Sequence, residues 1–179
     1  CNPPYRKLAA NEVAKYSGQY RTVVEGQPNV YGLFIDRAMR LVRKNGYVGL
    51  LTPTSFLSGQ YFSKLRTKLL SHSDVLQVDM LSDRTAMFVY VEQETAITTL
   101  RLKEPSPAQA TTTHVSVLSS EGNFVEVGVC QLPNSGKPWA IPRASTDAAL
   151  LLAADQCPAR LGDFGYQARV GALVAYRDE

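Results

Sequence analysis

The residues best suited to chemistry stand at the start of the sequence, in the run Asn2-Pro3-Pro4-Tyr5. A purine amine is a poor nucleophile because its lone pair is delocalised into the ring, and two hydrogen-bond acceptors aimed at the amine hydrogens counteract this. Asn2 offers a side-chain carbonyl, and Pro3 offers a main-chain carbonyl whose direction the two locked φ angles fix. Pro4 keeps the loop stiff, so these acceptors need little reorganisation when charge develops on the nitrogen. Tyr5 supplies a flat ring on which an extruded base can stack, worth about 1 to 3 kcal/mol.

The same four residues also allow two simpler interpretations. Two prolines followed by a tyrosine are typical of a rigid turn, in which Tyr5 would merely pack against the loop. Asn-Pro-x-Tyr is also a turn that phosphotyrosine-binding-type domains read. The rest of the sequence must therefore distinguish a catalytic loop from a structural turn.

Size and composition indicate one globular unit with a proper core. The chain has 179 residues, of which 45% are hydrophobic and 20% are charged. It has no apolar run near the roughly 20 residues that span a bilayer, and its N-terminus lacks the pattern of a signal peptide. We therefore expect a cytoplasmic protein without membrane contact. Cys1, Cys130 and Cys157 share no metal-binding spacing, so we expect free thiols and no metal site.

The net charge is only +3, and the local distribution of charge is more informative. The segment after Tyr5 mixes basic and aromatic side chains around a single acid, Glu12. Its candidate DNA-binding residues are Arg6, Lys7, Lys15 and Arg21. Such a segment suits contacts with phosphates, although a solvated surface loop has the same composition.

Hydrophobic periodicity and turn residues predict alternating helices and strands. Residues 6–28 indicate a loop with at most a short helix. The next elements are a helix that begins at Asn29 and extends to about Lys44, a buried strand over residues 47–53, a helix over 59–72 and a strand over 75–81. Helices alternating with buried strands indicate an α/β fold.

A β-rich run over residues 95–102 follows, and the composition then changes. Residues 104–114 are rich in Pro, Ser and Thr and are the best candidate domain boundary. The hairpin expected next has strands at 115–118 and 123–129, and a helix over 145–155 should be capped by Ser145 or Thr146. Trp139 is interpreted as a packing anchor, and His114 as a surface or strand-start residue.

This succession resembles motifs four to eight of the gamma-type N6-adenine DNA methyltransferases of type II and IIG restriction-modification systems. The resemblance covers about residues 1–103 and rests on NPPY, the helix YGLFIDRAMRLVRKNG, the strand YVGLLTP with TSFL after it, and FVYVEQETAITTLRL. It implies the C-terminal half of a class I (Rossmann-like) methyltransferase sheet that uses S-adenosylmethionine. The strands over 47–52 and 75–81 would be parallel, with 95–102 reversed between them.

The resemblance also implies roles for particular residues. Asn2, Pro3, Pro4 and Tyr5 would be catalytic, and Asn2 and Pro4 would contact S-adenosylmethionine. Phe88 would line the pocket of the flipped adenine opposite Tyr5, although a Phe beside two valines is also typical of a core. The Gly-rich loop that binds most of the cofactor would precede Cys1. We therefore expect a fragment that is inactive by itself.

These features predict three segments and one leading function. Residues 1–103 would be the C-terminal half of the catalytic domain, 104–160 a connector with a hairpin and a helix, and 161–179 the start of a target-recognition domain or a plain β-rich segment. The leading function is methylation of adenine in double-stranded DNA. Two alternatives stay open: an NPPY methyltransferase that acts on RNA bases or protein glutamine, and an inactive interaction fragment.

Overall fold

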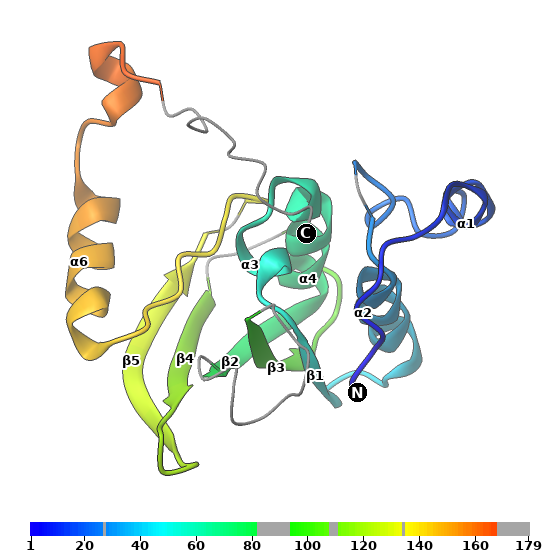
Figure 1. Ribbon diagram of the computed structural model, residues 1–179, viewed down its shortest axis with the longest axis horizontal. Helices are drawn as coiled ribbons and strands as arrows, with labels where there is room; N and C mark the ends of the chain where they lie inside the picture. The colour runs from blue at the N-terminus through cyan, green and yellow to red at the C-terminus, as the bar shows by residue number, and fades with distance from the viewer. Residues whose placement is uncertain (27, 82–93, 108–110, 134, 168–179) are drawn as a thin grey trace, which may run out of the picture.

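A five-stranded sheet forms the centre of the computed structural model, which describes residues 1–26, 28–81, 94–107, 111–133 and 135–167 (Figure 1). The strand order is β1-β3-β2-β4-β5. The strands are β1 (Tyr47–Pro53), β2 (Ser73–Leu81), β3 (Thr95–Leu102), β4 (Thr111–Leu118) and β5 (Phe124–Leu132). The chain is therefore a mixed α/β structure, as its sequence predicted.

Strand β3 is antiparallel to both of its neighbours, β1 and β2. Pro53, at the end of β1, and Leu81, at the end of β2, both pair with Thr95, the first residue of β3. The prediction of two parallel strands with a reversed strand between them is confirmed. The carboxyl ends of β1 and β2 therefore meet at one edge of the sheet, named here the carboxyl edge.

The helices follow the predicted order with different bounds. They are α1 (Ala10–Tyr16), α2 (Val30–Leu41), α3 (Ser55–Ser58), η1 (Gln60–Phe62), α4 (Ser63–His72), α6 (Ser145–Gln156) and η2 (Leu161–Phe164). Helix α2 stops before Lys44 because Val42 is already extended and Asn45 turns with φ 60°. The Asn45 amide then donates to the carbonyl of Leu102 and starts β1 beside β3. The helix predicted over 59–72 is divided into η1 and α4.

The β4–β5 hairpin belongs to the central sheet. β4 lies parallel to β2, and β5 pairs with β4 around the turn that was predicted at residues 119–122. The Pro-rich and Thr-rich composition of residues 104–114 suggested a connector, but Thr113 is buried in β4 and its hydroxyl donates to the carbonyl of Val75 at 2.8 Å. The boundary predicted after residue 103 therefore lies inside this sheet.

The core lies between the sheet and the helices α2 and α4, and it contains residues such as Ile35, Leu65 and Leu100. The carboxylate of Asp36 in α2 is fully buried there and is ion-paired with Arg40 and with Lys68 of α4. Because a buried charge is costly without partners, this cluster fixes how α2 packs on α4. No helix in the described part of the chain is long and apolar enough to cross a membrane.

Residues 135–144, which lead into α6, are named here the strap. It crosses α3 at Trp139, which is 2% exposed, packs edge-on against Phe56 and donates its amide to the carbonyl of Leu57. The prediction that Trp139 is a packing anchor is confirmed. The predicted cap of α6 is wrong: Ala144 occupies the N-cap, and the Asp147 carboxylate accepts from its amide. An acid in the first turn thus accepts from the N-cap amide, in place of an N-cap hydroxyl that would accept from an amide of the first turn.

Candidate active site

The run Asn2 to Tyr5 lies beside the carboxyl end of β1. The Cys1 amino group donates to the Gly49 carbonyl at 2.8 Å, and the Leu51 amide donates to the Cys1 carbonyl at 2.9 Å. A residue in a parallel neighbouring strand makes this pair of hydrogen bonds around its partner, here Leu50. Cys1 thus runs alongside β1, and the next residues continue toward the carboxyl edge, where open α/β sheets bind their ligands.

The four residues differ in exposure in a way that suits a rigid loop. Pro3 is buried, whereas Asn2 and Pro4 are exposed and Tyr5 is half-buried. The buried ring of Pro3 anchors the loop, and the locked φ angles of both prolines limit its movement. The amide of Asn2 is therefore presented to solvent from a fixed backbone.

The Tyr5 ring is held from two sides. Its hydroxyl donates to the Leu51 carbonyl at 3.1 Å, and its ring meets Tyr31 edge-on with centroids 6.4 Å apart. Tyr31 in turn stacks on Phe62 at 5.6 Å and shares a 2.7 Å hydrogen bond with Ser55. Burial raises the pKa of both phenols, that of Tyr31 to about 12, so both stay neutral at pH 7.

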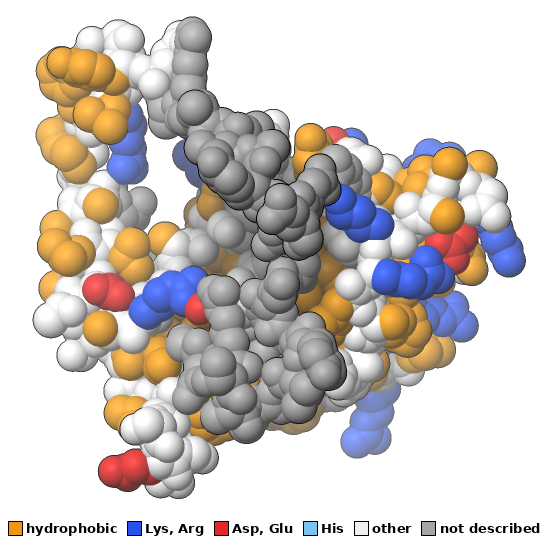
Figure 2. All heavy atoms as spheres, in the orientation of Figure 1, with side chains coloured by type: hydrophobic (Ala, Val, Ile, Leu, Met, Phe, Trp, Pro, Cys, Tyr) orange, Lys and Arg blue, Asp and Glu red, His pale blue; other side chains and the backbone are white. Residues whose placement is uncertain are grey.

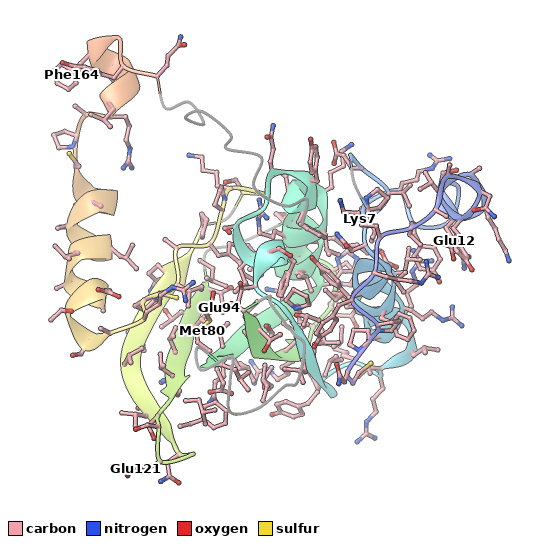
Figure 3. All side chains as sticks on the ribbon, in the orientation of Figure 1. Lys7, Glu12, Met80, Glu94, Glu121 and Phe164 are labelled. Atoms are coloured by element: carbon pink, nitrogen blue, oxygen red, sulfur yellow. The ribbon has the colours of Figure 1, made fainter. Side chains whose placement is uncertain are left out.

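A second polar cluster ties three distant segments together at the carboxyl edge. The Glu94 carboxylate accepts from the Thr54 hydroxyl at 3.2 Å and pairs with both terminal nitrogens of Arg143 in the strap. The Thr54 amide also donates to the Glu94 carbonyl at 2.9 Å. Figure 3 shows Glu94 over the sheet near Met80, which comes from the end of β2. This pairing raises the pKa of the Arg143 guanidinium.

Sequence reasoning missed Tyr31, Ser55, Glu94 and Arg143. Tyr31 lies in a helix that the periodicity found, but nothing in the sequence indicates that its ring reaches Tyr5. Ser55 belongs to the quoted TSFL run without a role assigned to it. Arg143 is 49 residues from Glu94, and only the fold brings this pair together.

The candidate DNA-binding residues belong to the segment that contains α1, and Figure 2 shows Lys and Arg side chains on that side of the molecule. Arg6 is held by two 2.7 Å hydrogen bonds to Glu12, which lower the pKa of that carboxyl to about 2. Lys15 lies over the Tyr16 ring at 5.4 Å. All four candidate residues are exposed: Arg6, Lys7, Lys15 and Arg21. Figure 3 shows Lys7 and Glu12 on the α1 side of the molecule, apart from Glu94.

Two predictions lie outside the described residues. Phe88 falls within residues 82–93, and most of the segment predicted to begin target recognition falls within 168–179. The described part of that segment, residues 161–167, forms η2 followed by a turn. The pocket role of Phe88 stays a prediction.

Comparison with known proteins shows which proteins this chain resembles. Residues 1–88 match the family described as Eco57I restriction-modification methylase. Over 98% of its length the chain is also 26% identical to the Type II methyltransferase M.PstI of Providencia stuartii, of which it covers 36%. The predicted resemblance to restriction-modification methyltransferases is confirmed.

Solved structures of methyltransferases share the fold. A modification subunit of a putative type I restriction enzyme from Vibrio vulnificus YJ016 superposes with a TM-score of 0.52 at 13% identity, over 87% of this chain and 30% of its own. A putative class I S-adenosylmethionine-dependent methyltransferase from Listeria monocytogenes gives 0.50 at 18% identity, over 68% of this chain and 36% of its own. The class I methyltransferase fold predicted from sequence is confirmed. The chain spans about a third of the length of these relatives.

Proposed function

We propose that this chain is the target-presenting half of an N6-adenine DNA methyltransferase in a restriction-modification system. The observation that carries the proposal is the rigid NPPY loop at the carboxyl edge of the sheet, with Asn2 exposed and Pro3 buried. The match of residues 1–88 to a restriction-modification methylase family, and the similarity to a type II methyltransferase, support a methyltransferase of such a system. The adenine amine is the group that two fixed acceptors suit best.

The carbonyls of Asn2 and Pro3 would accept hydrogen bonds from the two hydrogens of the adenine amine. This draws the nitrogen toward tetrahedral geometry and frees its lone pair, and no titrating base is needed. Tyr5 would carry the flipped base on the exposed part of its ring, because Leu51 and Tyr31 fix the orientation of that ring. Phe88 would close the pocket from the other side.

S-adenosylmethionine would supply the methyl group. Asn2 and Pro4 are exposed at the carboxyl edge, so they fit one side of a cofactor bound there. The described residues contain no Gly-rich loop between a strand and a helix of the kind that holds such a cofactor. These residues would therefore orient the amine toward the methyl group, and the main cofactor contacts would come from the other half of the catalytic domain.

Double-stranded DNA would be the partner, with Arg6, Lys7, Lys15 and Arg21 on its phosphates. Arg6 would exchange Glu12 for a phosphate, which a guanidinium binds in the same bidentate way. In the proposed division residues 1–103 belong to the catalytic half, whose sheet continues through β4 and β5 into the predicted connector 104–160, and residues 161–179 would be the start of target recognition. A cytoplasmic location would give the enzyme access to its DNA substrate.

The proposal is tested by methylating DNA with the full-length enzyme and identifying the modified base. Unmethylated duplex DNA and S-adenosylmethionine carrying a labelled methyl group are the substrates, and mass spectrometry of the digested nucleosides is the readout. We expect label in N6-methyladenine alone. RNA and a glutamine-containing protein substrate serve as matched controls. Label in either control and none in DNA would refute the DNA assignment.

A further inference from the structure

The guanidinium of Arg66 is buried under the strap, with 1% of the residue exposed. It donates to four main-chain carbonyls: those of Phe56 and Gly59 at 2.9 and 2.7 Å, and those of Gly136 and Lys137 at 2.7 and 2.9 Å. Of its five N–H groups, one on Nη2 has no acceptor among the described residues. Arg66 thus holds the strap to α3 and α4, and one of its Nη2 N–H groups is left without an acceptor among the described residues.

The charge of Arg66 has no negative partner in the described part of the chain. Every ion pair found there joins other residues, and burial alone lowers the pKa of this guanidinium. Buried charges in proteins are usually paired with an opposite charge, because desolvating an unpaired ion is costly. The surroundings of Arg66 would therefore favour an anion.

An open pocket of about 490 Å³ lies against Arg66. Besides Arg66, its wall carries the cation of Lys137, the hydroxyls of Ser58, Ser63 and Ser135, and the amide of Gln60. None of the lining residues is acidic. Helix α4, ten residues long, begins at Ser63, so its positive end also faces this region. Two cations, a helix N-terminus and neutral donors form the chemistry of a phosphate site.

The wall of this pocket is fixed by the close approach of Gly136 to Ser63. A Cβ added at Gly136 would collide with the Ser63 hydroxyl and with its main-chain carbonyl. The strap is therefore seated directly on the first turn of α4. Such a seat fixes the main chain at Gly136 and the Ser63 hydroxyl beside it before a ligand arrives, which reduces the entropy lost on binding.

We propose that this pocket binds a phosphate group, and that the group is a phosphodiester of the DNA backbone. The second half of this inference rests on the proposed function, since only a DNA-binding enzyme would bring a phosphodiester to the strap. Lys137 and the hydroxyls of Ser58 and Ser63 would contact the phosphate. Arg66 would add its spare N–H and its unpaired charge.

The test uses the full-length enzyme with Lys137→Ala and Ser58→Asp, and two probes. Inorganic phosphate is titrated by calorimetry, and duplex DNA is bound at a series of salt concentrations by fluorescence anisotropy. Each variant should weaken phosphate binding at least tenfold. Losing one phosphate contact should also reduce the slope of log K against log[salt] by about 1. The matched controls are Lys44→Ala and Ser120→Asp, which make the same changes at exposed positions outside the pocket.

Each outcome decides one part of the inference. Unchanged phosphate binding in both variants would overturn the site. Weakened phosphate binding with an unchanged salt slope would establish the phosphate site and overturn its assignment to DNA. Failure of the unmodified enzyme to bind DNA at all would refute the proposed function, and the phosphate titration would then decide the pocket alone.

Discussion

Tyr5 gives the sharpest test of the proposed site, because its hydroxyl and its ring have separable roles. Tyr5→Phe removes the hydrogen bond to the Leu51 carbonyl and keeps the ring. Such a bond contributes about 1 kcal/mol, and Leu51 is only half-buried, so water can replace the lost donor. We expect Tyr5→Phe to keep most of the activity and to loosen the ring only slightly.

Tyr5→Ala removes the ring as well. The edge contact with Tyr31 contributes about 0.5 to 1.5 kcal/mol to folding, whereas stacking of an extruded base contributes about 1 to 3 kcal/mol to binding. At 1.4 kcal/mol per factor of ten, affinity for the flipped base should fall about 5-fold to 150-fold. The fall in thermal stability should be the smaller effect because Tyr5 is half-buried.

The assay is binding of duplex DNA with a fluorescent base analogue at the target position, together with thermal melting of each variant. The analogue reports stacking directly, and melting reports folding. Tyr31→Phe is the control, because it removes the hydroxyl that meets Ser55 and leaves both rings in place. Equal analogue signals from Tyr5→Phe and Tyr5→Ala would refute the stacking role. A large melting loss in Tyr5→Ala with unchanged base binding would mean that the ring serves the fold.

Three further predictions concern the loop, the core and the segment around α1. Asn2→Ala should lower methyl transfer about 10² to 10³-fold in a turnover assay with little change in melting, while Asn2→Asp keeps an acceptor and part of the activity. Asp36→Ala should lower the free energy of unfolding, measured with denaturant, by about 3 to 5 kcal/mol, because it leaves two cations without their buried partner. The control Asp74→Ala removes a partly exposed pair and should lower it by less than about 1 kcal/mol. The pKa of Glu12 falls from 4.5 to about 2 on folding, so its pairing with Arg6 should be intact above pH 4.5 and lost as the pH falls through 2. An NMR titration of the Glu12 carboxyl measures this, and a titration midpoint near 4.5 would show that the pair does not form.

The order of the elements was predictable because each has a local signal. The buried run over β1, the amphipathic pattern of α2 and the turn at residues 119–122 depend on side-chain burial and turn chemistry, which act over a few residues. The reversed strand β3 came from the resemblance, since strand direction leaves no local signal. The end of α2 was misplaced because Asn45 takes a left-handed backbone conformation to meet Leu102, a partner 57 residues away.

The connector shows how composition can mislead. Threonine and proline are common in linkers, but threonine is also a good strand former, and only pairing with another strand decides between the two. Here Thr113 uses its hydroxyl to reach Val75 across a strand pair that joins residues far apart in sequence. A parallel pairing of this kind is not connected by a tight turn, so it leaves no local sequence signal, and the sequence could not place β4 in the sheet.

The NPPY loop could be proposed as a site from one short motif, whereas the contacts between segments that hold this loop were missed. NPPY carries its own geometry in two locked φ angles, so its chemistry follows from four residues. The support of that loop comes from elsewhere: Tyr31 in α2 meets Tyr5, and Glu94 joins Thr54 to Arg143. Arg143 in the strap is linked to the Tyr5 ring by four contacts, namely Arg143–Glu94, Glu94–Thr54, Ser55–Tyr31 and Tyr31–Tyr5, with Thr54 and Ser55 adjacent in the chain. The strap therefore connects the segment that leads to the C-terminus with the loop that would hold the base.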